Sequence, residues 1–140
     1  MKISAHLENS KGKHEVIFQT NDNKHSMTIS PKPDGFGSSI NGGELLFLAI
    51  ATCYCNDIYR EAAKRKIKVS YVEVTVEGEF GKEGEPAKNI LYEARITADA
   101  TKSKTEELMR YTDSVTEIQN TIRAKVPVFL SRVEAETSSK

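Results

Sequence analysis

The sequence predicts a single α+β domain, residues 1–140, in which mostly antiparallel sheets surround a buried central helix. The expected order is three strands, an apolar helix, two strands, an amphipathic helix and a last strand, so strands occur in runs rather than in strict βαβ alternation. The apolar stretch from Leu45 to Cys55 contains only one residue, Thr52, that is not aliphatic, aromatic or sulfur-bearing. A chain of 140 residues suits one domain.

Alternation of apolar and polar residues predicts three short strands in the first 30 residues. Their apolar faces carry Ile3, Ala5 and Leu7, then Val16 and Phe18, then Met27 and Ile29. The polar turns NSKGK and NDNK separate the strands, and the loop SPKPDGFGSS follows them. This loop is too short to be a domain linker.

The central helix is expected to begin after Asn41, whose side chain can cap it, with Glu44 placed to bond back to the cap backbone. Its first half is apolar on most sides, whereas its second half, NDIYREAAKRK, is amphipathic and ends in basic residues. The first half should therefore be buried and the second half should reach solvent. Because one chain of this size offers such a helix too little cover, the sequence predicts a homodimer.

A β-hairpin is expected after Ile67, where the pattern changes to period two. The apolar faces of its strands carry Val72, Val74 and Val76, then Ile90, Tyr92, Ala94 and Ile96, on either side of the turn GKEGEPAKN.

A second helix is expected to start near Ser103, with Glu106 completing a capping box. Its apolar stripe consists of Leu108, Tyr111, Val115, Ile118 and Ile122. Val126 to Val133 is expected to form the last strand, which Pro127 places at a sheet edge or a strand start. Residues 134–140 should form a frayed tail.

Charge and hydropathy exclude several classes of partner. Lys plus Arg and Asp plus Glu are 20 each, so the formal net charge is zero and we expect neither nucleic acid nor a membrane as partner. The apolar stretch is shorter than the ~20 residues that span a bilayer, and the N-terminus has no apolar core of signal-peptide length. We therefore expect a cytoplasmic protein whose thiols stay reduced.

The two cysteines lie two residues apart, so on a helix their side chains point about 200° away from each other. They cannot form a disulfide unless the helix unwinds. A metal site is not expected either, because structural zinc normally needs four ligands and the three histidines, His6, His14 and His25, all lie on the N-terminal strands. No cofactor is expected.

The surroundings of the two thiols differ. Cys55 shares its helix face with Phe47, Ala51, Ile58 and Ala62, which is typical of a small buried hydrophobe. Cys53 lies where the helix surface changes from apolar to charged, one turn before Asp57 and two turns before Arg60. A thiol at such a boundary can be reached by solvent and can feel a cation, as a reactive thiolate requires. Spacing alone leaves open whether Cys53 is reactive or inert.

The segment GGELLFLAIATC, Gly42 to Cys53, resembles the pattern E-L-L-x-L-A-x-A-x-C of the OsmC/Ohr family of peroxide-handling proteins. The segment AAKRKIKVSYVEVTVEGEF resembles the end of that family's central helix and the strand after it, and EELMRYTDSVTEIQNTIRAKVPV resembles the family's second helix and last strand. The resemblance covers about residues 36 to 128. It implies an intertwined α+β homodimer with active sites at the subunit interface.

The resemblance also implies a function, the reduction of organic hydroperoxides or hydrogen peroxide by a peroxidatic cysteine, here Cys53. The family's orienting glutamate lies ten residues before this cysteine, at Gly43; Glu44 lies nine before it, as in a divergent branch, and is our candidate for that role. For the activating arginine the N-terminal turn offers only Lys11 or Lys13.

The position of the family's second, resolving cysteine falls on Thr116. We therefore expect a one-cysteine mechanism in which an external thiol reduces the oxidised Cys53. The alternatives are a non-catalytic dimer that binds a small hydrophobic or thiol ligand, and a redox sensor. The expected partners are a second copy of the chain, a small-molecule peroxide and an external thiol reductant.

Overall fold

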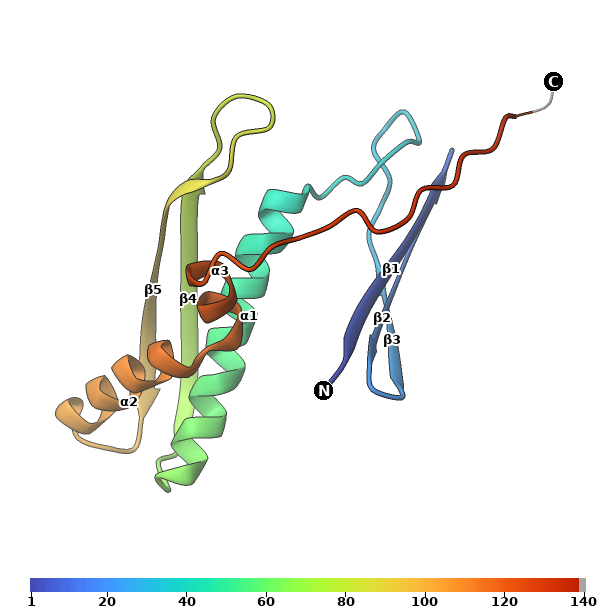
Figure 1. Cartoon of the computed structure of the whole chain (residues 1–140). Coiled ribbons are helices and arrows are strands. Elements are labelled where there is room, and N and C mark those ends of the chain that lie inside the picture. Colours follow the sequence, from blue (N-terminus) through green and yellow to red (C-terminus); the bar gives the residue numbers. More distant parts are fainter. Residues whose placement is uncertain (139–140) are drawn as a thin grey trace. The chain divides into compact units, whose positions relative to one another are not determined.

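The computed structural model describes residues 1–138 and has the α+β composition that the sequence predicts (Figure 1). The chain forms two compact units, residues 1–48 and the residues from 49 onward, with the central helix α1 (Gly42–Lys64) running across the boundary. Within the described residues, no helix is long and apolar enough to cross a membrane.

The first unit contains the three predicted strands, β1 (Ile3–Ser10), β2 (Lys13–Thr20) and β3 (Asn23–Thr28). They form an antiparallel sheet in the order β1-β2-β3. The register places Leu7 opposite Val16 and Val16 opposite Met27, so apolar side chains form one row across the sheet. A shift of one residue in the pairing would move these apolar side chains to the other face of the sheet, so the alternating pattern specifies the register.

Helix α1 starts with the capping box that the sequence predicts. The Glu44 backbone N–H donates to Asn41 Oδ1 at 2.8 Å, and the Asn41 N–H donates to Glu44 Oε1 at 3.1 Å. Two of the amides that a helix N-terminus leaves without intrahelical partners are thereby satisfied.

The second unit is built on the predicted hairpin, β4 (Val69–Glu79) and β5 (Lys88–Ala98). Its apolar face pairs Val72 with Ile96, Val74 with Ala94 and Val76 with Tyr92. The core against this face consists of Tyr54, Ile58, Ala62 and Leu108. The hairpin therefore packs on the second half of α1.

Burial along α1 consequently differs from the sequence prediction. The buried residues run from Ile50 to Ala62, whereas Leu46 and Leu48 keep 36% and 56% of their surface exposed. In the amphipathic half one side is buried, because the hairpin and α2 (Lys102–Val115) pack against it, and the other side reaches solvent as predicted, with Tyr59 46% exposed. The apolar first half is the part left exposed in the single chain.

The second predicted helix is two helices, α2 and α3 (Glu117–Arg123). Thr116 interrupts them with an extended backbone, and its hydroxyl donates to the Asp113 carbonyl at 3.0 Å, a local bond that competes with helix continuation. The predicted capping box of Ser103 and Glu106 is wrong, because Thr101 Oγ1 accepts from the Lys104 N–H instead.

The predicted last strand, Val126 to Val133, is also wrong for the single chain. Within residues 1–138 this segment is irregular, and Val128, Phe129 and Leu130 are 95%, 81% and 86% exposed. A strand needs a neighbouring edge to satisfy its backbone groups, and here the segment has no ladder. The fraying of residues 134–140 stays a prediction, and 139 and 140 lie outside the described residues.

Candidate functional site

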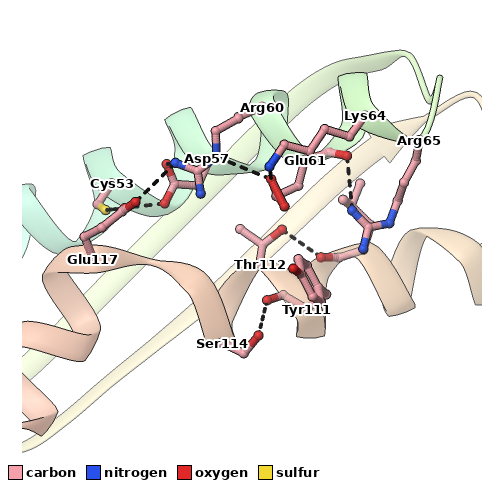
Figure 2. Close-up of polar contacts among 11 residues, drawn as sticks. Cys53, Asp57, Arg60, Glu61, Lys64, Arg65, Tyr111, Thr112, Ser114 and Glu117 are labelled. Atoms are coloured by element: carbon pink, nitrogen blue, oxygen red, sulfur yellow. Dashed lines mark hydrogen bonds and ion pairs between the residues drawn. The ribbon is translucent and has the colours of Figure 1, made fainter.

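The candidate site lies where α1 meets the first turn of α3 (Figure 2). The Cys53 thiol donates toward Asp57 Oδ2 at 3.6 Å and toward Glu117 Oε2 at 3.8 Å. Cys53 and Asp57 face the same way because they are four residues apart on one helix. Glu117 comes from the other helix, 64 residues along the chain. The thiol is half-buried, so it is accessible from solvent.

One guanidinium neutralises much of the acidic charge at this site. Arg60 Nη1 lies 3.0 Å from Asp57 Oδ1 and 3.4 Å from Glu117 Oε1, and its Nε lies 3.3 Å from Glu61 Oε2. Glu61 also pairs with Lys64, whose Nζ is 2.7 Å away. Both α1 carboxylates are almost fully buried, Asp57 at 6% and Glu61 at 2% exposure. Buried carboxylates are normally paired in this way.

The surroundings of Cys53 favour the neutral thiol. Burial raises the pKa of the thiol, and the charges of Asp57 and Glu117 raise it further, while a backbone hydrogen bond from Ile118 acts in the opposite direction. The net result is a pKa above the usual range. At neutral pH Cys53 is therefore mostly protonated, and its proton points toward carboxylate oxygens.

The two carboxyl groups beside the thiol differ in acidity. Burial, and after it the neighbouring Glu117 charge, raise the pKa of Asp57 against the opposing effect of Arg60. A hydrogen bond from its own backbone, together with Arg60, holds the pKa of Glu117 below its usual range. When carboxyl groups share a site, one of them takes up a proton first, and here that group is Asp57.

Cys55 lies on a different side of α1. It borders a shallow pocket with Ala51, Val72 and Val74, so it faces the hairpin as its apolar helix face suggests. Helix α1 runs without interruption through both cysteines, and both thiols are free.

The OsmC-like protein family model matches residues 35–131, more than two-thirds of the chain. The chain belongs to the OsmC-like family. No curated protein is detectably similar to it.

Solved OsmC-like structures share the fold. An OsmC-like protein from Mycoplasma pneumoniae matches with a TM-score of 0.58 and 16% identity, over 87% of this chain and 86% of that one. The organic hydroperoxide resistance protein OsmC from Legionella pneumophila matches with a TM-score of 0.59 and 21% identity, over 88% of this chain and 90% of that one. An organic hydroperoxide resistance protein from Elizabethkingia anophelis matches with a TM-score of 0.52 and 18% identity, over 88% of this chain and 89% of that one.

The residues that the OsmC resemblance singled out lie in different surroundings. Glu44 is engaged in the α1 cap and lies nine positions before Cys53, a rise of about 13.5 Å along the helix axis. Lys13 Nζ lies 3.8 Å from Glu15 Oε2 in the first sheet. Thr116 directly precedes Glu117, so the position expected for a second cysteine adjoins a residue that reaches the thiol.

Sequence reasoning identified Asp57 and Arg60 from their helical spacing to Cys53, but it missed Glu117. In this OsmC-like chain Cys53, Asp57 and Glu117 place their ligand atoms within 4.8 Å of one another, the one such group of potential metal ligands among residues 1–138. Arg60 already binds both carboxylates, so a metal ion would have to compete with it. No local pattern links positions 53 and 117, because only the packing of α3 on α1 brings them together.

Proposed function

We propose that this protein reduces organic hydroperoxides or hydrogen peroxide through Cys53, with an external thiol as reductant. The observation that carries the proposal is a solvent-accessible thiol 3.6 Å from a proton acceptor, Asp57, which Arg60 in turn holds at 3.0 Å. A nucleophile beside a base, with the base held in turn by a third group, is the arrangement that activates a weak nucleophile. Here the three groups are Cys53, Asp57 and Arg60. The names of the Legionella and Elizabethkingia relatives, organic hydroperoxide resistance proteins, support the substrate class.

The chemistry needs one cysteine of the protein. Cys53–SH and ROOH give Cys53–SOH and ROH, a two-electron oxidation of the sulfur. One external thiol then forms a mixed disulfide with Cys53 and water is released. A second external thiol attacks the outer sulfur of that disulfide, which breaks the bond to Cys53, restores Cys53–SH and joins the two external thiols in a disulfide. Thr116 cannot resolve the sulfenic acid, and Cys55 faces the hairpin.

The proposal includes a homodimer in the cytoplasm, where external thiols are abundant. Exposed apolar residues on α1 and in the C-terminal segment support the dimer, because a second copy could bury side chains that the single chain leaves in solvent. In that dimer Glu44 is proposed to orient a cation, Lys11 or Lys13, that favours the thiolate.

The decisive experiment measures peroxide consumption by wild type and Cys53→Ser, with dihydrolipoamide and separately with a monothiol. We expect turnover by wild type, none by Cys53→Ser, and unchanged turnover by the matched control Cys55→Ser. After one equivalent of peroxide, a dimedone-type probe should label Cys53. Equal peroxide consumption by wild type and Cys53→Ser would refute the proposal.

The raised pKa of Cys53 favours one alternative, a non-catalytic dimer whose pocket binds a small hydrophobic or thiol ligand. A neutral thiol suits binding better than attack. This alternative predicts that alkylating reagents modify Cys53 while wild type consumes no hydroperoxide with either reductant. A redox sensor would instead be oxidised at Cys53 once, without turnover.

A further inference from the structure

We propose that Asp57 is the proton-transfer residue of the site, taking the proton from the Cys53 thiol and delivering it to the oxygen that leaves the peroxide. This inference rests on the proposed function and names the residue that would carry the proton during peroxide reduction. The thiol donates toward Asp57 Oδ2 over 3.6 Å, so the transfer requires no rearrangement of the helix.

Asp57 is held in position through its second oxygen. Arg60 Nη1 binds Oδ1 at 3.0 Å, which leaves Oδ2 directed at the thiol. Both residues lie on α1, so their relative placement depends on a single rigid element. Arg60 is therefore a positioning residue that fixes the carboxylate without touching the sulfur.

Glu117 is the less suitable proton carrier, although its carboxylate is also near the thiol. Its Oε2 is 3.8 Å from the sulfur, and its side chain is 64% exposed, whereas that of Asp57 is 8% exposed. An exposed carboxylate gives its proton to water readily. A buried one retains the proton for transfer within the site.

The transfer also solves the charge problem at Cys53. With Asp57 and Glu117 ionised beside Arg60, the group carries one negative charge, and a free thiolate would add a second. When the thiol proton moves to Asp57, the charge of the group stays the same. The sulfur can therefore become nucleophilic whether or not a lysine also lies against it.

The Cys53 sulfur attacks the OH oxygen of ROOH, an S–O bond forms and the O–O bond breaks. The thiol proton passes to Asp57 Oδ2 and then to the departing RO oxygen, which leaves as ROH. Cys53 is oxidised to the sulfenic acid, the peroxide is reduced, and Asp57 is again a carboxylate.

The test compares two leaving groups in a Cys55→Ser background. Single-turnover oxidation of Cys53 is followed with tert-butyl hydroperoxide, whose alkoxide needs a proton, and with peracetic acid, whose acetate needs none. Iodoacetamide alkylation reports the thiolate separately. Asp57→Asn should react with tert-butyl hydroperoxide about a hundredfold more slowly. Its peracetic acid rate should not fall, and its alkylation should become faster because a negative charge is lost.

Glu117→Gln is the matched control, because it also removes one carboxylate near the sulfur. Its alkylation should become faster and its tert-butyl hydroperoxide rate should not fall. Equal losses with both peroxides in Asp57→Asn, or no loss with either, would overturn the relay while leaving the proposed function intact. If wild type reacts with neither peroxide although Cys53 is alkylated, the proposed function fails and the relay fails with it.

A measurement on wild type keeps the test valid should Asp57→Asn not fold. A built-in proton donor makes the rate depend weakly on the basicity of the leaving oxygen. Across a series of hydroperoxides and peracids, wild type should therefore show a shallower dependence than free cysteine. A slope as steep as that of free cysteine would also overturn the relay.

Discussion

At the scale of single residues, charged groups from two elements set the surroundings of the Cys53 thiol. Asp57 and Glu117 both place carboxylate oxygens near the sulfur, and Arg60 neutralises only part of their charge. The helix spacing made Cys53 the more reactive candidate of the two thiols. Because burial and these charges raise the pKa of the thiol, the proposed transfer of its proton to Asp57 would supply the nucleophile at neutral pH.

The pH dependence of Cys53 alkylation follows from this environment. In Cys55→Ser, the iodoacetamide rate should rise about tenfold per pH unit through neutral pH, because the raised pKa keeps the thiolate a minor form there. Arg60→Gln removes the nearby cation and should move the inflection to still higher pH. An inflection below about pH 7.5 would instead mean that a cation from elsewhere, such as a second copy, lies against the sulfur.

Glu44 offers a second test at this scale. In Glu44→Gln the amide oxygen can still accept from the Asn41 N–H, so stability should change little. If Glu44 orients a lysine toward the thiol, alkylation of Cys53 at pH 7 should nevertheless fall several-fold. Asn41→Ala serves as control, because it should lower stability by about 1 kcal/mol and leave the alkylation rate unchanged. A Glu44→Gln protein with wild-type alkylation would restrict Glu44 to capping.

At the scale of elements, the N-terminal cap of α2 differs between the structure and the sequence prediction. Thr101, and not Ser103, caps α2, with Thr101 Oγ1 accepting at 3.2 Å from the Lys104 N–H. Thr101→Ala should lower the free energy of unfolding by about 1 kcal/mol, and Ser103→Ala should change it by less than about 0.5 kcal/mol. Urea denaturation of the two variants measures this difference. A larger loss for Ser103→Ala would mean that the helix starts where the sequence pattern placed it.

The sequence pattern predicted correctly those elements that are determined by residues close together in the chain. The α1 capping box and the alternation in β1 to β5 depend on neighbours within a few residues, and they were confirmed. The break at Thr116 was missed because the apolar stripe continues on α3 after a single extended residue. In the site, Asp57 and Arg60 followed from helical spacing, whereas Glu117 depends on a helix contact across 64 residues that no periodicity encodes.

At the scale of the whole molecule, apolar side chains stay exposed at two places in the described chain. Val128, Phe129 and Leu130 are almost fully exposed in an irregular segment where the sequence pattern is that of a strand. Leu48 is more than half exposed at the apolar end of α1. A strand pattern without a partner strand and an apolar helix without cover are both explained if a second copy supplies the missing surfaces, as in obligate dimers with core-like interfaces.

We therefore expect wild type to be a dimer at micromolar concentration and the double variant Val128→Ser/Leu130→Ser to dissociate. The two side chains would share one face of a strand, and burying each contributes roughly 1.5–3 kcal/mol. Their loss should thus raise the dimer dissociation constant by at least about a hundredfold. Glu134→Gln/Glu136→Gln, a double change in the polar part of the same segment, is the matched control and should leave the constant unchanged. Sedimentation equilibrium over a concentration series measures all three proteins. A stable, folded wild-type monomer at micromolar concentration would contradict the dimer, because the exposed apolar residues would then be tolerated without cover.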